Sequence, residues 1–218
     1  MDTKKQKVVY FVRHGQSVDN ASPVFQSVGS PLSEEGKKQA VKIAGRLVKL
    51  DFEVLIASPL PRAKETARAI SSRTHKDIVF SDLFVERIKP IEIDGKPWTD
   101  EKANKIWRAW TETLYASGER VGKGENYDDI VQRADKALLF LLDRPESKLV
   151  VVTHGYFLRV LVARVLLGDN LSGETMKRFQ EHASIENTAI TVLQYKDAFE
   201  EEYTWRLWTL NDHSHFAE

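Results

Sequence analysis

The stretch Val8-Val9-Tyr10-Phe11-Val12-Arg13-His14-Gly15 is apolar and rich in β-branched residues until it ends abruptly at a cation, an imidazole and a glycine. Such a run is typical of a strand that is buried on both faces, as in a parallel sheet covered by helices. The same pattern recurs in Leu149-Val150-Val151-Val152-Thr153-His154-Gly155. Because ligands of open α/β sheets bind outside the carboxyl ends of the strands, both junctions predict functional residues at that edge.

Between the two junctions the chain alternates helix and strand patterns. Ser33 can cap a helix whose apolar positions continue to Leu47. The pattern from Phe52 to Ser58 predicts a second strand, and a further helix starts at Pro59-Leu60-Pro61-Arg62, because proline is tolerated in a first turn. We therefore expect Arg62 at the carboxyl end of a strand, like Arg13 and His14.

Two segments are expected to lie over this edge of the sheet. The mixed, turn-rich sequence from Val18 to Ser30 predicts a long loop. From about residue 90 to 124 the alternation stops, and a helical stripe that includes Trp107 and Trp110 predicts a helix packed on the body of the protein. We interpret this second segment as a small helical insertion over the active-site crevice, with Lys96 and Trp98 as candidates for setting the substrate.

The remaining patterns complete one domain spanning residues 1–218. They are a short strand at 78–80, a helix from 126 to 142, a helix that ends near Gly168, and a hairpin made of 188–195 and 203–210. The predicted fold class is α/β, a three-layer sandwich whose mostly parallel central sheet is covered by helices on both faces.

The composition of the 218 residues excludes several classes of function. Lys+Arg and Asp+Glu each total 32, so the formal net charge is +0 and no overall field favours nucleic acid or a membrane surface. With Cys 0 there is no thiolate nucleophile and no cysteine metal site. Only five apolar residues precede Arg13, too few for a signal-peptide core, and no run is long enough to span a bilayer. We expect a cytoplasmic protein in which locally grouped basic side chains bind any anionic ligand.

These motifs resemble those of the histidine phosphatase superfamily, in its phosphoglycerate-mutase-like branch. Arg13-His14-Gly15, followed by Asn20, resembles the family signature, and Thr153-His154-Gly155 resembles its second histidine motif. Similar matches lie between them, at Pro31-Leu32-Ser33 with Gly36 and Gln39-Ala40, and at Ser58-Pro59-Leu60 with Arg62-Ala63 and Thr66-Ala67. The resemblance runs from about Val8 to Tyr195.

The resemblance implies a mechanism for these residues. His14 would attack phosphorus and form a phosphohistidine that water hydrolyses. The phosphoryl oxygens would be held by Arg13, Arg62, His154, the amide of Asn20 and the backbone at Gly155. Glu86 matches the family's proton donor, but the sequence after it departs from the commonest family pattern, which leaves Glu92 and Asp94 as alternatives.

No metal or other cofactor is implied, because the arginines supply the positive charge. His213 and His215 resemble a metal pair only superficially, and Asn187 is interpreted as a supporting residue beside the last strands. The predicted enzyme is a metal-independent phosphomonoesterase acting on a small phosphate ester, and the short insertion favours hydrolysis. A phosphoglycerate-type mutase would use the same residues and is the alternative; a catalytically silent phosphate-binding module is a third hypothesis. The sequence specifies neither the substrate nor the oligomeric state.

Overall fold

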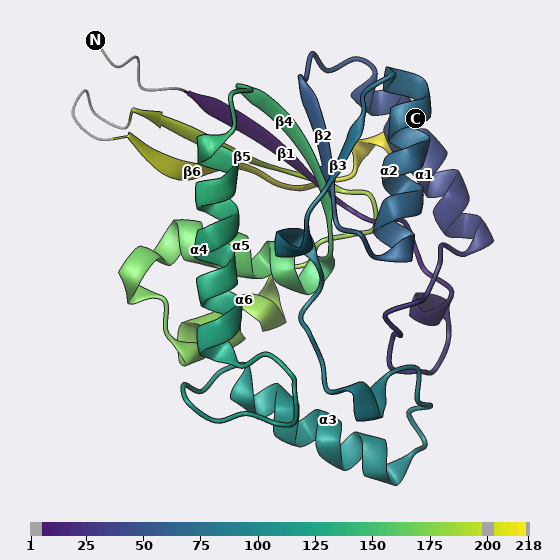
Figure 1. Ribbon diagram of the computed structural model, residues 1–218, viewed down its shortest axis with the longest axis vertical. Coiled ribbons are helices and arrows are strands. Elements are labelled where there is room, and N and C mark those ends of the chain that lie inside the picture. Colours follow the sequence, from purple (N-terminus) through teal and green to yellow (C-terminus); the bar gives the residue numbers. More distant parts are fainter. Residues whose placement is uncertain (1–5, 198–202, 217–218) are drawn as a thin grey trace.

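The computed structural model describes residues 6–197 and 203–216 (Figure 1). Within them one sheet has the strand order β3-β2-β4-β1-β5-β6. The strands β1 (Lys7–Arg13), β2 (Val54–Ala57), β3 (Ile78–Phe80) and β4 (Lys148–Thr153) are parallel, whereas β5 (Ile190–Asp197) and β6 (Tyr203–Asp212) form an antiparallel edge. The predicted mostly parallel sheet and its closing hairpin are confirmed.

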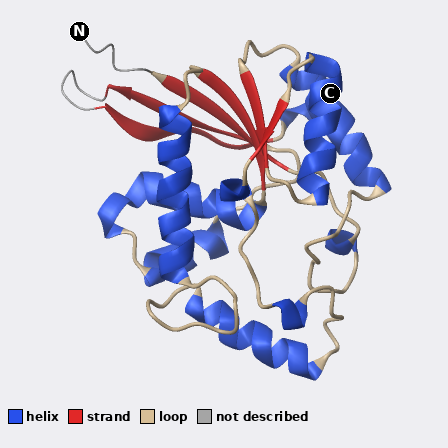
Figure 2. Ribbon diagram, in the orientation of Figure 1, coloured by secondary structure: helices blue, strands red, loops and turns tan. Residues whose placement is uncertain are grey.

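Helices cover both faces of this sheet (Figures 1 and 2). On one face α1 (Glu34–Leu47) and α2 (Pro61–Thr74) pack over β1, β2 and β4 through a core that includes Ile43, Leu55 and Val152. On the other face lie α4 (Tyr127–Asp143) and α5 (Gly155–Leu167), packed through Leu141, Phe157 and their neighbours. These two cores confirm the three-layer α/β sandwich.

Local signals set the starts of the helices. The Ser33 side chain accepts a hydrogen bond from the Gly36 amide, which caps α1 as expected, and Pro61 occupies the first turn of α2. At the start of α4, Asn126 and Asp129 form a reciprocal capping box. The helix starts therefore agree with the sequence prediction, and the start of α2 places Arg62 just beyond β2.

The insertion and the long loop lie against each other. The insertion contains the 3₁₀ helix η3 (Ile91–Ile93) and α3 (Glu101–Thr113), and the loop contains η1 (Asp19–Ala21). Val24 pairs with Pro97, and the ring of Phe25 lies 4.9 Å from that of Trp107. Trp110 is fully buried and donates to the Glu125 carbonyl at 2.8 Å. The two segments thus support each other at one end of the sheet.

One helix has no counterpart in the sequence prediction. It is α6 (Gly173–His182), which follows the 3₁₀ helix η4 (Gly168–Asn170) and begins with a capping box between Ser172 and Thr175. Its buried residues are Met176 and Gln180. A helix that turns a thioether and an amide inward has no clear apolar period, so hydrophobic periodicity does not reveal it.

In the described part of the chain no helix has the length and apolar character needed to cross a membrane.

Candidate active site

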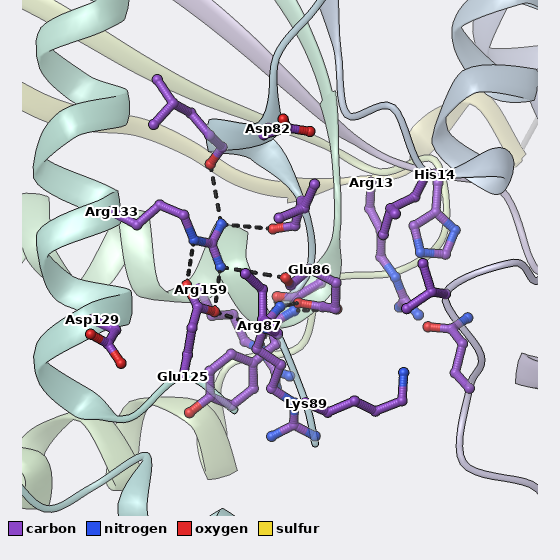
Figure 3. Close-up of a pocket in the computed structure, with 18 of the residues that line it drawn as sticks. Arg13, His14, Asp82, Glu86, Arg87, Lys89, Glu125, Asp129, Arg133 and Arg159 are labelled. Carbon is purple, nitrogen blue, oxygen red and sulfur yellow. Dashed lines mark hydrogen bonds and ion pairs between the residues drawn. The ribbon is translucent and has the colours of Figure 1, made fainter. Parts of the chain in front are cut away.

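The carboxyl ends of β1, β2 and β4 face a cavity of about 1280 Å³ (Figure 3). Among the predicted site residues, those that line it are Arg13, His14, Asn20, Arg62, Glu86 and Gly155. His154 is fully buried, and its ring centroid lies 4.9 Å from that of His14. The parallel register of β1 and β4, which pairs Arg13 with Thr153, accounts for this closeness of the two histidines.

The two ring nitrogens of His14 have different hydrogen-bond partners. Its Nδ1 lies 2.7 Å from the Gly15 carbonyl oxygen, which can only accept, so Nδ1 carries the proton. The other nitrogen, Nε2, keeps its lone pair and accepts from Nε of Arg62 at 3.3 Å. Burial, and then the charges of Arg62 and Arg13, lower the pKa of His14 well below its usual range. The ring is therefore neutral at pH 7, as a nucleophile must be.

The glycines of the motif allow the backbone after His14 to pass very close to α1. A Cβ atom on Gly15 would lie 2.5 Å from the Gly36 carbonyl oxygen, and a Cβ on Gly36 would lie 1.9 Å from that of Gln16. The same turn is fixed by Thr66, whose hydroxyl accepts from the Gly15 amide at 3.1 Å, and by Gln39, which accepts from the Gln16 amide at 2.8 Å. Residues of the sequence motifs thus hold the backbone around His14 in place.

Two arginines place positive charge near the ring of His14. Arg62 is 2% exposed and also donates to the Ser27 carbonyl at 3.3 Å. Burial lowers its pKa to about 10, against the opposing charge of Glu86, so the group stays cationic at neutral pH. Arg13 donates to the Ile185 carbonyl at 2.6 Å, while its buried Nε has no protein partner. These guanidinium groups keep donors available for an anion.

His154 is held by the opposite ring nitrogen. Its Nε2 lies 2.8 Å from the Ser58 hydroxyl, and its buried Nδ1 has no protein partner. Burial, and then the charge of Arg62, lower the pKa of His154 well below its usual range. Two arrangements satisfy this bond: the Ser58 hydroxyl donates to Nε2 and the ring proton lies on Nδ1, or Nε2 carries the proton and donates to Ser58.

Glu86 lies at the amino terminus of α5. Its carboxylate accepts from the amides of Tyr156 at 3.3 Å and Phe157 at 3.1 Å, and from that of Arg87 at 3.0 Å. Two of the first amides of α5 are therefore already occupied, and Gly155 offers the remaining one near Arg13. Of the three candidate acids, Glu86 is the one in the cavity wall, because Glu92 is exposed and Asp94 pairs with Lys89 at 2.7 Å.

The structure adds cavity residues that the sequence did not indicate. The guanidinium of Arg87 lies over the rings of Trp107, Trp110 and Tyr156, at 4.8, 5.0 and 4.3 Å from their centroids. Arg133 pairs with Glu125 at 2.7 Å and donates to backbone carbonyls of the segment before Glu86 (Figure 3). Further cations in the wall are Lys89, Arg120, Lys123, Lys136 and Arg159. Side-chain patterns in a helix or loop give no sign of which cations turn inward.

Lys96 and Trp98, the insertion residues expected to determine substrate specificity, lie outside the wall of the main cavity. Trp98 is 56% exposed and lines a separate, smaller hollow beside Asn20, and Lys96 is exposed. Trp107 and Trp110 line the main cavity instead. The effect of Lys96 and Trp98 on substrate ranking stays a prediction.

The supporting residues take definite places. Asn20 accepts from the Ser17 amide at 3.3 Å, and Asn187 donates to the His14 carbonyl at 2.8 Å. His215 lies in the 3₁₀ helix η5 (Ser214–Phe216) and contacts Arg46 and Thr188. No group of three or more potential metal ligands occurs within residues 6–197 and 203–216.

Comparison with known proteins identifies related chains. A sequence profile described as the histidine phosphatase superfamily (branch 1) matches residues 9–212. Proteins named probable phosphoglycerate mutase GpmB, from Escherichia coli and Shigella boydii, are 30% identical over 213 residues, which cover 95% of this chain and 94% of theirs.

Solved structures have the same fold. That of a putative alpha-ribazole-5'-P phosphatase from Escherichia coli is 21% identical, with a TM-score of 0.76 and coverage of 94% of this chain and 96% of that one. A mycobacterial glucosyl-3-phosphoglycerate phosphatase solved with VO3 is 25% identical, with a TM-score of 0.72 and coverage of 95% and 99%.

Proposed function

Because the chain belongs to the histidine phosphatase superfamily, we propose that it hydrolyses small phosphate monoesters through a phosphohistidine formed on Nε2 of His14. The observation that carries this proposal is the state of the His14 ring. Its Nδ1 is tied to the Gly15 carbonyl, and its unprotonated Nε2 lies beside Arg62. A neutral imidazole next to a cation at the floor of a cavity is suited to attack an anionic phosphoryl group.

In the first step the bond between Nε2 of His14 and phosphorus forms as the bond to the ester oxygen breaks. The departing alkoxide takes a proton from the carboxylic acid of Glu86. Arg13, Arg62 and Nδ1–H of His154 donate to the phosphoryl oxygens, and Asn20 and the Gly155 amide complete the binding site. The N–H of Arg62 that now bonds Nε2 transfers its hydrogen bond to an oxygen of the substrate.

In the second step a water molecule attacks phosphorus and gives its proton to the Glu86 carboxylate. The phosphorus–nitrogen bond breaks, and inorganic phosphate leaves with His14 neutral again. Both steps are promoted by fixed positive charge from the arginines and the start of α5, so we propose that no metal ion takes part.

The test is a rapid-quench experiment under alkaline conditions with a labelled phosphate ester. We expect an acid-labile phosphoenzyme that peptide mapping assigns to His14. His14→Ala should abolish the label, whereas His154→Ala should slow labelling and turnover without moving the site. Label on His154, or an active enzyme that forms no phosphoenzyme in a single turnover, contradicts the proposal.

A mutase is the second candidate, favoured by the names of the relatives that are 30% identical. Such an enzyme returns the phosphoryl group to a second hydroxyl of the substrate. Incubation with 3-phosphoglycerate separates the two reactions, because hydrolysis releases inorganic phosphate whereas a mutase yields the 2-phospho isomer. We expect release of phosphate to exceed isomerisation.

A further inference from the structure

A five-residue segment, Ile185–Ala189, holds the backbone that carries the nucleophile. The Ile185 carbonyl accepts from Arg13 at 2.6 Å, and Asn187 donates to the His14 carbonyl at 2.8 Å. The Thr188 amide donates to the Arg13 carbonyl at 2.9 Å, and the Arg13 amide donates to the Ala189 carbonyl at 3.3 Å. The positions of Arg13 and His14 therefore depend on this segment.

Thr188 is in an unusual backbone conformation at the centre of the segment. Its φ is +59°, in the left-handed region that β-branched residues disfavour, and its side chain is fully buried. Such a conformation persists only where the surroundings fix it. The Thr188 hydroxyl lies 2.7 Å from the Asn187 carbonyl oxygen and 3.2 Å from Nε2 of His215.

The hydrogen bonds around His215 have a single consistent direction. The guanidinium of Arg46 lies 3.2 Å from Nδ1 of His215 and can only donate, so Nδ1 accepts and Nε2 carries the proton. Nε2 then donates to the Thr188 hydroxyl, which in turn donates to the Asn187 carbonyl. Arg46 itself is paired with both carboxylate oxygens of Asp212. Every donor in this chain of bonds has an acceptor.

The end of β6 holds the same segment at a second point. The Asn211 side chain accepts from the Glu186 amide at 2.6 Å, and the Asn211 amide donates to the Thr191 hydroxyl at 3.3 Å. On its outer side η5 rests against α1, where Lys42 lies over the ring of Phe216 at 5.2 Å. Arg46, Asp212 and His215 do not line the cavity, so any effect they have on the reaction passes through the segment.

We propose that His215 and Arg46 are positioning residues, which fix Thr188 in its left-handed conformation and thereby set the positions of Arg13 and His14 for attack on phosphorus. The kinetic consequence of this positioning role rests on the proposed phosphatase function. Displacement of a nucleophile by a fraction of an ångström slows attack more than it weakens binding of the rest of a substrate. The loss should therefore appear mainly in kcat.

Three variants test this, with a matched control. Thr188→Val keeps the shape and removes the hydroxyl, and His215→Phe keeps a ring and removes both nitrogens. His215→Gln places an amide N–H close to the position of Nε2 and so restores the donor to Thr188. The control is Thr113→Val in α3, which also removes a buried hydroxyl, bonded to the Trp110 carbonyl at 2.8 Å, but does not contact the segment. Thermal unfolding of each variant measures how much of any loss is loss of folded protein.

We expect kcat for ester hydrolysis to fall roughly 10- to 100-fold in Thr188→Val and His215→Phe, with KM changed less than about threefold. His215→Gln should recover most of that loss, and Thr113→Val should keep the wild-type kcat. Folded Thr188→Val and His215→Phe with kcat within about twofold of wild type would overturn the proposal. The proposal would also be overturned if His215→Gln were no more active than His215→Phe, and this comparison remains decisive where Thr188→Val does not fold.

Binding of inorganic phosphate separates this inference from the proposed function. If the wild-type protein releases phosphate from no ester, the proposed function fails, and titration calorimetry with inorganic phosphate decides the positioning role instead. Weakening of roughly two- to threefold in Thr188→Val and His215→Phe, absent from Thr113→Val, supports it. Equal affinities in all four proteins overturn it.

Discussion

Replacement of Glu86 by glutamine should affect catalysis and stability in separable ways. The amide side chain of Glu86→Gln has no acidic proton, so a substrate whose leaving alkoxide must be protonated loses general acid catalysis, about 10²- to 10⁴-fold in rate. Esters such as p-nitrophenyl phosphate, whose phenolate leaves without a proton, should lose less than about tenfold. The difference between the two substrates, rather than either rate alone, identifies the proton donor.

The stability effect follows from the contacts of the carboxylate. Both oxygens of Glu86 accept amide N–H groups, from Tyr156 on one side and from Phe157 and Arg87 on the other. A glutamine replaces one oxygen with an NH₂ group that cannot accept, so at least one amide loses its partner, at a cost of about 1–3 kcal/mol. Thermal unfolding should therefore show a lower midpoint for Glu86→Gln.

The assay compares initial rates on an alkyl phosphate and on p-nitrophenyl phosphate for wild type, Glu86→Gln, Glu92→Gln and Asp94→Asn. The last two are matched controls, because both remove a carboxylate of the same segment that lies outside the cavity wall. Only Glu86→Gln should discriminate between the substrates. Equal losses on both substrates, or discrimination by either control, would show that Glu86 is not the acid.

Two further predictions concern metal and pH. Ester hydrolysis should survive excess EDTA, because the charge on the phosphoryl oxygens is met by Arg13, Arg62 and the start of α5; loss of activity that magnesium or zinc restores would refute this. Plots of kcat/KM against pH, corrected for ionisation of the substrate, should show no fall attributable to His14 until the pH is well below the ordinary histidine pKa of 6.5. Burial, and then the charges of Arg62 and Arg13, lower the pKa of His14, so the reactive neutral form of the ring remains populated at acidic pH. A fall in kcat/KM near pH 6.5 that an NMR titration assigns to His14 would contradict this.

The central part of the fold could be predicted from the sequence because its signals are local. The apolar strands are buried on both faces and end at Arg13 and at Thr153, and parallel pairing then brings their carboxyl ends together. The proximity of His14, Arg62 and His154 follows from topology, without any knowledge of side-chain conformation. The sequence pattern therefore predicts that these three side chains lie together, and the structure confirms it.

Other parts of the site depend on long-range packing and carry no such signal. Arg133 lies on the inward stripe of α4, between Ile130 and Ala137, but the helical pattern does not show what an inward arginine binds. Its partners, the Glu125 carboxylate and the carbonyls of Leu83, Val85 and Glu86, come from other segments of the chain. Lys96 was expected to face the substrate, yet its backbone carbonyl accepts from the Phe25 amide at 2.8 Å and its side chain is exposed. Both outcomes are decided by which segments meet, and the sequence pattern does not encode this directly.

The two strand-His-Gly junctions also show why similar sequence does not mean similar chemistry. His14 bonds its own neighbour through Nδ1, so Nε2 is left as an unprotonated nitrogen beside Arg62. His154 is bonded at Nε2 by Ser58, a residue that follows the adjacent strand β2, so Nδ1 is the nitrogen without a protein partner. The two rings are thus bonded to protein through opposite nitrogens, Nδ1 to a carbonyl in His14 and Nε2 to a hydroxyl in His154. Under the proposed function the first junction attacks phosphorus and the second binds its oxygens, and the residue that bonds the second ring lies 96 positions away in the chain.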